Sequence, residues 1–344
     1  MDTSLVIINQ DAPRALEMIG AAANSAATHH LLADYQARKS SETLRRQRAD
    51  IALFASYLLA AGVLVEPGAM AVDLALWRGV TWGLVDGFNR WSLAQAYAIG
   101  SVNVRLATIK TYCALAARAG AISAQELALI KTVHGYRAEE GRNVDEKREQ
   151  SATRTRRPDA RKAEPVSISP THAALLKKQP AATSKGRRDA LIVCLLVDHG
   201  LRVGEIAALN LSALDLDTGM LTFYRRKVHK VQIHQLTPDT WQAARAYLGI
   251  LSEHDQDTPL FTGPCSKGRI SERTINARIA ALGKRLDIAA LSPHDGRHFW
   301  ATDAVRNGTD IKSLQDAGGW SSPAMPLRYA ESGKIANEGV KLSS

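Results

Sequence analysis

The 344-residue sequence contains only three cysteines and no apolar run long enough to cross a membrane. The cysteines, Cys113, Cys194 and Cys265, are odd in number and far apart, which argues against a disulfide framework and against a zinc cluster. The N-terminal stretch MDTSLVIINQDAPRALEMIG lacks the basic start of a signal peptide. These features predict a cytoplasmic protein without a disulfide framework.

Acidic residues are also scarce relative to basic ones. The chain has 34 Asp and Glu against 44 Lys and Arg, a formal net charge of +10. This charge indicates a polyanionic partner, most simply nucleic acid, although charge alone does not distinguish nucleic acid from an anionic membrane surface. The length leaves room for two domains, each able to bury its own hydrophobic core.

One stretch, from about Gly141 to Lys162, differs in composition from the rest. It has eight basic and four acidic residues and almost no apolar ones, so we expect an exposed linker between two domains. Such a run is usually only solvated, but a basic linker would also follow a phosphate backbone. The predicted organisation is given by residue ranges: an N-terminal extension (1–39), a helical domain (40–140), the basic linker (141–166) and a second domain with a C-terminal tail (167–344).

The half of the chain before the linker shows helical periodicity. Apolar residues recur at spacings of three and four, the pattern of a helix with one buried face. This predicts a small helical bundle. The residues that carry the pattern are Ile51, Phe54 and Leu58, and, behind Ser101, Leu106, Ile109, Cys113 and Ala116.

The half after the linker has a mixed pattern. SPTHAALLKKQ and KGRRDALIVCLLVDHG are typical of helices, the second ending at Gly200. The runs MLTFYRR and VQIHQLT flank a polar, basic turn and predict a β-hairpin with Lys227, His229 and Lys230 near its tip. The expected fold class is mainly α with a small antiparallel β-sheet. Further helical patterns begin at Pro238, Ser271, Pro293, Asp310 and about Ser322.

The segment SPHDGRHFWAT has the signals of a helix start. Ser292 is a favourable N-cap, Pro293 suits the first helical position, and Asp295 lies three residues after the cap. The positive end of the helix dipole then lies beside His294, which predicts an anion site.

Two other interpretations of this segment must be weighed. His294 and His298 are four residues apart and share a helix face, a spacing that can bind a metal. Arg297 lies on the same face and would repel a cation, and no nearby cysteine or carboxylate cluster completes a ligand set. We therefore expect no metal here. A capped surface helix with scattered polar residues is the second interpretation of this segment taken alone.

Four segments in order resemble the signature regions of the tyrosine recombinase (phage integrase) family: HGLRVGEIAALN, RKVHKVQIHQL, SPHDGRHFWATDAVRNGTDIKSLQDAGGWSS and PLRYAES. The resemblance covers roughly residues 167–332, and the N-terminal half resembles the family's helical core-binding domain more loosely. It implies an enzyme that breaks and rejoins DNA through a 3′-phosphotyrosyl link, with no metal, nucleotide or other cofactor. It also implies a C-shaped clamp with one domain on each side of the duplex.

The resemblance further implies that six residues surround one DNA phosphate. A tyrosine has a pKa near 10, so only about one in a thousand is ionised at neutral pH and the nucleophile Tyr329 needs a base, here His294. Lys227 would protonate the leaving 5′ oxygen, with Lys230 as its rival. The two arginines would hold the non-bridging oxygens. The six expected catalytic residues are Arg202, Lys227, His294, Arg297, Trp320 and Tyr329.

Each of these residues also has an ordinary structural explanation when taken singly. Arg202 could form a helix salt bridge with Glu205, Lys227 could be one of several solvated cations, and Tyr329 could belong to the core. His298 is interpreted as a packing or supporting residue. As an ordered set, however, the six residues favour an active site.

The sequence departs from the usual family pattern at two positions. Gly296 stands where leucine is usual before the helix arginine, and this weakens that turn of helix slightly. Trp320 stands where histidine is more common. Neither departure removes a group that the chemistry needs.

We therefore expect a site-specific recombinase that acts on double-stranded DNA as a homotetramer on paired sites and that can be a monomer when free of DNA. The tail ESGKIANEGVKLSS follows directly after Tyr329 and is expected to dock on a neighbouring protomer. Two alternatives remain open from the sequence: an enzyme like a type IB topoisomerase, which relaxes DNA without sequence choice, and a DNA-binding relative without activity.

Overall fold

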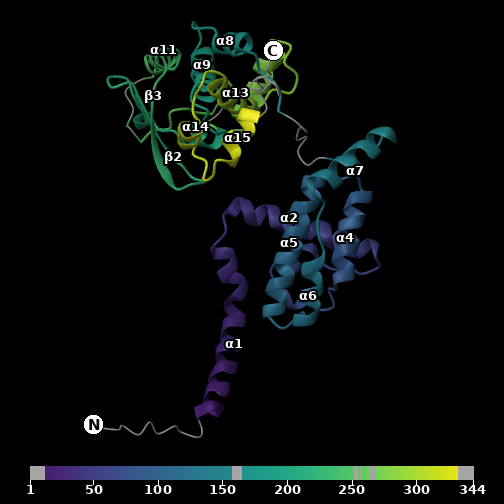
Figure 1. The fold of residues 1–344 in the computed structure, drawn as a ribbon. Coiled ribbons are helices and arrows are strands. Elements are labelled where there is room, and N and C mark those ends of the chain that lie inside the picture. The colour runs from purple at the N-terminus through teal and green to yellow at the C-terminus, as the bar shows by residue number, and fades with distance from the viewer. Residues whose placement is uncertain (1–11, 157–164, 252–254, 256, 264–267, 332–344) are drawn as a thin grey trace, which may run out of the picture. The chain divides into compact units, whose positions relative to one another are not determined.

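The computed structural model describes residues 12–156, 165–251, 255, 257–263 and 268–331, and the chain forms two compact units, residues 1–162 and 163–344 (Figure 1). Within the described ranges, no helix is both long and apolar enough to cross a lipid bilayer.

The first unit is helical, as predicted. Its helices have the bounds α1 (Ala12–Ala37), α2 (Ser41–Ala60), α3 (Pro67–Met70), the short 3₁₀ helix η1 (Leu74–Trp77), α4 (Trp82–Ala94), α5 (Ile99–Arg118), α6 (Ala124–Thr132) and α7 (Ala138–Gln150).

The core of this unit lies between α2, α4, α5 and η1. All seven apolar residues that carried the periodic pattern are buried on α2 and α5, so the predicted bundle is confirmed. Trp77 links the two helices, because its ring stacks on Phe54 at 5.7 Å and on Tyr112 at 5.6 Å between ring centroids.

Helix α7 contradicts the prediction of an exposed linker, which is wrong for residues 141–150. Gly141 and Arg148 are buried in this helix. Arg148 Nη2 donates hydrogen bonds to the backbone oxygens of Leu93 and Tyr97, at 3.0 and 3.1 Å, near the C-terminal end of α4. A cation at a helix C-terminus satisfies carbonyls that lack partners within the helix. The helix therefore packs through one arginine and one glycine, which an apolar count does not register.

The second unit combines helices with one small sheet, and the predicted helix starts are found within two residues of their expected positions. Its elements have the bounds α8 (Pro170–Lys177), α9 (Ser184–Val197), α10 (Val203–Ala208), the 3₁₀ helix η3 (Leu211–Ala213), β1 (Leu214–Asp215), β2 (Met220–Arg225), β3 (Lys230–Gln235), α11 (Pro238–Leu248), α12 (Glu272–Lys284), α13 (Pro293–Arg306), α14 (Ile311–Gly318) and α15 (Ala324–Glu331).

The sheet is antiparallel with the order β1-β2-β3, so the predicted hairpin and the predicted fold class are confirmed. The short strand β1 was not predicted. Alternation along β2 turns Leu221, Phe223 and Arg225 inward. Arg225 pairs with Lys230 at the end of the hairpin next to the turn.

Helix α9 forms the centre of the second unit and contacts α8, α11 and α13. Helix α13 lies close to α9 at Gly296, where an added Cβ would be 3.1 Å from Leu196 Cβ and 3.5 Å from Val197 Cγ1. This close approach accounts for glycine at a position where the family usually has leucine. It also fixes the start of α13, which carries the histidines and Arg297.

His199, directly after α9, makes the stability of the second unit depend on pH. Its side chain is 3% exposed, and its Nε2 lies 3.1 Å from Thr240 Oγ1. Burial, assisted by the charge of Lys177, lowers the His199 pKa to about 4 from the usual 6.5. Between pH 6.5 and 4 the unfolded chain therefore binds one proton more than the folded chain at this site, and the free energy of unfolding falls as the pH falls through this window.

The expected contribution of His199 is a loss of about 2 kcal/mol of folding free energy between pH 7 and pH 5. Denaturant unfolding of the wild type and of His199→Gln at both pH values measures it. The variant should lose about 2 kcal/mol less than the wild type over this interval. An identical pH dependence in the two proteins would show that His199 is not held neutral by burial.

Candidate active site

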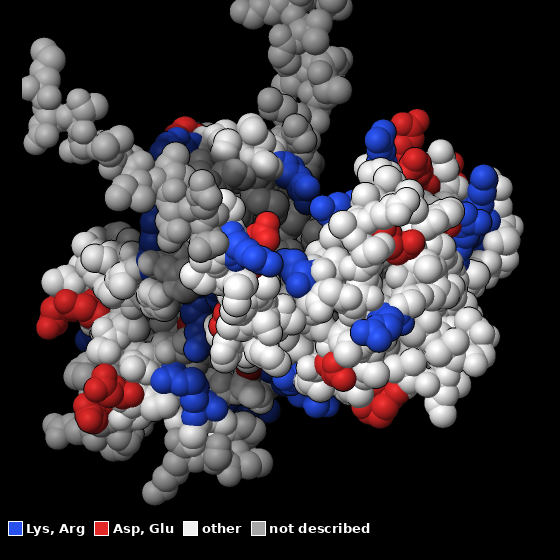
Figure 2. All heavy atoms as spheres, turned by 90° about the horizontal axis from the view of Figure 1, so that it is seen from below, with Lys and Arg blue, Asp and Glu red and all other residues white. Residues whose placement is uncertain are grey.

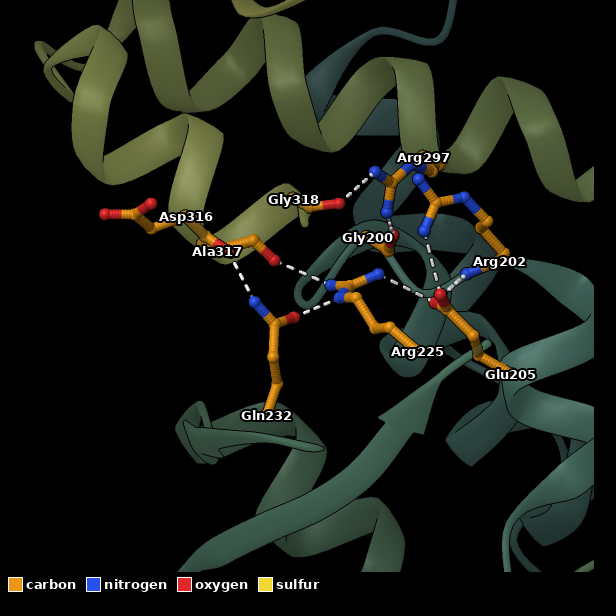
Figure 3. A network of polar contacts seen from close by, with 9 residues as sticks. All are labelled: Gly200, Arg202, Glu205, Arg225, Gln232, Arg297, Asp316, Ala317 and Gly318. Atoms are coloured by element: carbon orange, nitrogen blue, oxygen red, sulfur yellow. Dashed lines mark hydrogen bonds and ion pairs between the residues drawn. The ribbon is translucent and has the colours of Figure 1, made fainter. Parts of the chain in front are cut away.

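Two arginines from different elements, Arg202 and Arg225, bind one carboxylate, that of Glu205, and a third, Arg297, lies within electrostatic range of it (Figure 3). Arg202 is the N-cap residue of α10, and its Nη1 donates to Glu205 Oε1 at 2.8 Å. Its backbone N–H donates to Glu205 Oε2, also at 2.8 Å. The salt bridge between Arg202 and Glu205, which was the alternative explanation of Arg202, therefore exists. It also links Arg202 to the other arginines near Glu205. We call Arg202, Arg225, Arg297 and Glu205 the arginine cluster.

Arg297, on α13, is the second predicted arginine and is only 3% exposed. Its Nη1 donates to the backbone oxygen of Gly200, and its Nη2 donates to that of Gly318 at 2.6 Å. Burial, together with the positive charges of Arg202 and Arg225, lowers its pKa to about 9, which leaves it protonated at neutral pH. The guanidinium is therefore a fixed positive charge that joins the end of α9 to the end of α14.

Trp320 and Tyr329 lie next to Arg297. Trp320 follows Gly319, which ends α14 in the left-handed conformation (φ 60°). The Trp320 indole lies 4.6 Å from Arg297 Cζ, measured from the ring centroid, and its centroid lies 5.6 Å from that of the Tyr329 ring. Tyr329, on α15, is 3% exposed. Trp320 therefore lies between Arg297 and Tyr329, and Arg202 and Tyr329 both lie within electrostatic range of Arg297.

The environment of Tyr329 makes its phenol a weaker acid than a free tyrosine. Burial raises the Tyr329 pKa, and the positive charges of Arg297, Arg328 and Arg202 oppose this rise without cancelling it. The ring of His298 meets the Tyr329 ring edge to face at 4.9 Å. His298 is therefore a packing neighbour of the predicted nucleophile, and a base is needed if Tyr329 is to attack at neutral pH.

His294 is not brought into this group by a direct contact. It is exposed in the first turn of α13 and makes no hydrogen bond to another residue in the described part of the chain. The helix is capped as predicted, but the Asp295 carboxylate accepts hydrogen bonds from the Ser292 N–H and O–H, both at 2.7 Å, and from the Val166 N–H at 2.8 Å. The Asp295 carboxylate therefore satisfies the N-cap N–H of this helix, and the anion site expected beside His294 stays a prediction.

Lys227 lies in the turn between β2 and β3 and is exposed. Together with Arg202 and Trp320 it lines a cavity of about 840 Å³ between the hairpin and the segment that follows α14. Lys230 lines the same cavity, so the geometry offers both lysines to a group bound there. No group of three or more His, Cys, Asp or Glu side chains is arranged to hold a metal, either at this cavity or elsewhere in the described ranges.

Arg225 is the functional candidate that the sequence analysis missed. Its side chain is completely buried and belongs to the arginine cluster. A signal was present, because the alternation that predicted β2 places residue 225 on the same inward face as Leu221 and Phe223. A charged residue on such a face needs a buried partner.

Comparison with known proteins shows what the chain resembles. Residues 171–334 match the family model described as the phage integrase family. This part of the chain is similar to the tyrosine recombinases. Tyrosine recombinase XerD of Rhizobium meliloti is 33% identical over 141 residues, which cover 40% of this chain and 45% of the relative. XerA of Thermococcus kodakarensis is 28% identical over 145 residues (42% and 51%), and XerC of Corynebacterium glutamicum is 26% identical over 267 residues (75% and 84%). The chain spans about half the length of the first two relatives.

Solved structures share the fold of the chain. The Tn1549 transposon integrase in complex with transposon right end DNA superposes with a TM-score of 0.60 at 14% identity, over 88% of this chain and 94% of that chain. A lambda integrase dimer bound to a COC′ core site gives a TM-score of 0.56 at 15% identity, over 92% and 98% of the two chains. Both confirm the mainly helical fold with its small antiparallel sheet.

Trp320 provides a test of the candidate site, because it differs from the commoner histidine. An indole has one N–H donor and no acceptor, so it can bind a phosphate oxygen but cannot carry a proton. The indole N–H of Trp320 makes no hydrogen bond to another described residue, and the ring packs on Trp300 with 6.0 Å between ring centroids. We expect Trp320→Phe to slow DNA cleavage about ten- to a hundred-fold, the effect of one lost charge-assisted hydrogen bond.

Single-turnover cleavage rates and melting temperatures of three variants separate binding from packing at this position. Trp320→His keeps a donor and should retain more activity than Trp320→Phe. Trp320→Ala leaves a cavity beside Trp300 and Tyr329 and should also lower the melting temperature. If Trp320→Phe cleaves as fast as the wild type and only Trp320→Ala is impaired, the indole acts through packing alone.

Proposed function

We propose that this protein is a site-specific recombinase that cleaves and rejoins double-stranded DNA through a 3′-phosphotyrosyl intermediate. The observation that carries the proposal is the contact series in which the buried Arg297 guanidinium lies against Trp320 and Trp320 lies against Tyr329. Attack of a tyrosine on a phosphodiester builds up negative charge on the phosphate oxygens, and a fixed positive charge near the tyrosine stabilises that charge.

The proposed cleavage step uses six residues. The Tyr329 oxygen attacks the phosphorus and loses its proton to His294, whose exposed ring is free of hydrogen bonds to other described residues. The bond from phosphorus to the 5′ oxygen breaks, and Lys227 supplies a proton to the leaving oxygen, a role for which Lys230 is also placed. Arg202 and Arg297 bind the non-bridging oxygens and offset the charge that develops on them, while the Trp320 N–H binds one of them.

Rejoining follows from the same chemistry in reverse. The phosphotyrosyl link is itself a phosphodiester, so the energy of the broken bond is retained. A 5′-hydroxyl can then attack the link, re-form the DNA strand and release Tyr329. The reaction therefore consumes no ATP, and we propose no metal or other cofactor for it.

Double-stranded DNA is the proposed partner. The net charge of +10 supports it, and so does the structural neighbour Tn1549 transposon integrase, which was solved in complex with transposon right end DNA. On the face seen in Figure 2, acidic side chains lie among the basic ones, so the positive charge is not gathered there into one continuous patch. We propose a homotetramer on paired sites, since two duplexes must be cut in step; the tail expected to join protomers lies outside the described residues.

Capture of cleaved DNA tests this function against both alternatives. The wild-type protein is incubated with fragmented DNA of its host, denatured, and the covalently attached fragments are sequenced. A site-specific recombinase should yield fragments that share one sequence with a break at a defined phosphate. Breaks scattered without sequence preference would indicate a topoisomerase-like enzyme, and an absence of attached DNA would indicate an inactive relative.

A further inference from the structure

Arg225 is a fully buried charged group that the cleavage step does not use. Its side chain is 0% exposed at the end of β2. Its three sets of N–H donors reach three other elements: Nη1 donates to Glu205 on α10 at 2.8 Å, Nη2 to the Ala317 oxygen on α14 at 2.6 Å, and Nε to the Gln232 side chain on β3 (Figure 3). Burial of a guanidinium lowers the free energy of unfolding unless its N–H groups have partners, and here each of the three nitrogens donates a hydrogen bond.

One side of this network ends at Arg202. The Glu205 carboxylate is shared, because its Oε1 accepts from Arg202 Nη1 and its Oε2 accepts from the Arg202 backbone N–H and from Arg225 Nη1. Two guanidinium groups thus share one carboxylate, and the three side chains together keep a net positive charge. Arg225 supplies the counter-charge that Arg202 would otherwise supply alone.

The other side of the network ends at the turn before Trp320. Ala317, which accepts from Arg225, directly precedes Gly318, whose backbone oxygen holds Arg297. The Arg225 side chain also packs against Gly319, where an added Cβ would lie 2.4 Å from Arg225 Cδ. A second support runs from the Gln232 amide to the Asp316 oxygen. The end of α14 is therefore fastened to the hairpin through Arg225.

We propose that Arg225 is a positioning residue that holds Arg202 and the Trp320 turn in the geometry that cleavage requires, without touching the phosphate itself. The proposal rests on the recombinase function proposed above. Arg202, Lys227 and Trp320 line the cavity that would receive the phosphate, whereas Arg225 is sealed behind them. Through Glu205, Arg225 leaves the charge of Arg202 available to the phosphate.

Two substitutions separate the contacts of Arg225 from its charge. Arg225→Met removes both, so Glu205 pairs with Arg202 alone and the α14 end loses an anchor. We expect single-turnover cleavage to slow about a hundred-fold, the effect of a small misplacement of reacting groups. Arg225→Lys keeps the charge but cannot reach all three partners, and should slow cleavage about ten-fold. DNA affinity should stay within about three-fold of the wild type in both, because neither removes a DNA contact.

A substrate with a methylphosphonate at the cleaved position gives a readout that a merely structural role would not move. This group lacks the phosphate's negative charge, so cleavage of it depends less on the positive charge available at Arg202. We expect the deficit of Arg225→Met to shrink from about a hundred-fold to about ten-fold on this substrate. Arg278→Met is the matched control, because Arg278 forms a partly buried ion pair with Asp189, between α12 and α9, that shares no residue with the cluster.

The outcomes are distinct. If the wild type forms no covalent adduct, the proposed recombinase function fails. If the wild type cleaves and Arg225→Met cleaves equally fast, the positioning role alone is overturned. The same holds if Arg225→Met is slowed by one and the same factor on the phosphate and the methylphosphonate substrate, the behaviour expected of the control Arg278→Met. Where Arg225→Met does not fold, Arg225→Lys decides, since wild-type cleavage by that variant would show that the three-way contact is not needed.

Discussion

Tyr329→Phe is expected to abolish covalent capture of DNA while leaving DNA binding intact. Phenylalanine lacks the oxygen that would attack phosphorus, and loss of a nucleophile lowers the rate by at least about 10⁴-fold in enzymes of comparable chemistry. The ring itself is kept, so the contacts with Trp320 and His298 can persist. A nicked substrate that loses its 5′-hydroxyl after cleavage should accumulate the adduct with the wild type and none with the variant.

The control for this experiment checks that Tyr329→Phe is folded and binds DNA. Electrophoretic mobility shifts and melting temperatures should agree between the wild type and Tyr329→Phe. If the variant binds the substrate and still forms the same adduct, Tyr329 is not the nucleophile. If the variant loses binding as well, the comparison is repeated at protein concentrations that restore equal occupancy.

Arg297→Lys is expected to have the second largest effect, a loss of about a hundred- to a thousand-fold in single-turnover cleavage. Removal of one preorganised donor from a developing negative charge has an effect of this size. Lysine keeps the positive charge, but a single ammonium cannot hold both the Gly200 and Gly318 oxygens and face a phosphate as the planar guanidinium does. The melting temperature should also fall, because two buried carbonyls lose a donor.

Arg306→Lys provides the matched control for that substitution. Arg306 lies in the last turn of the same helix, α13, and is exposed. The same change there should leave the cleavage rate within a factor of about two, since exposed charges contribute little. Wild-type cleavage by Arg297→Lys would contradict the placement of Arg297 at the phosphate.

Much of the fold could be predicted because its signals are local. Ser292 and Asp310 mark the starts of α13 and α14 as N-cap residues, and a cap depends only on the few residues that follow it. The hairpin was equally accessible, since its alternation and its polar turn are contained in sixteen consecutive residues, 220–235.

The features that sequence reasoning missed depend on contacts between distant residues. Helix α7 packs through Arg148 on carbonyls more than fifty positions earlier, so its composition resembled a linker. Arg225 finds Ala317 ninety-two positions later in the chain, and no local pattern indicates that pairing. The same limit applies to the start of α13, where the partner of the Val166 N–H is Asp295, 129 positions away.

The predicted site residues differ in how closely the structure associates them. Arg202, Arg297, Trp320 and Tyr329 form one connected group, and Lys227 shares a cavity with two of them. Their elements are brought together by three reversals of the chain, which lie at the end of α9, at the hairpin and at the end of α14. A sequence motif gives only the order of these residues along the chain. His294 lies three residues before Arg297 on α13, and neither His294 nor Lys227 makes a hydrogen bond or an ion pair with this group in the described structure.

The position of the covalent bond is the most direct test of the account. The adduct formed with a nicked substrate is digested with protease and nuclease, and the nucleotide-bearing peptide is sequenced by mass spectrometry. We expect a nucleotide joined through its 3′-phosphate to Tyr329, and a free 5′-hydroxyl on the released strand that polynucleotide kinase can label. A nucleotide on any other residue, or a link through a 5′-phosphate, would contradict it.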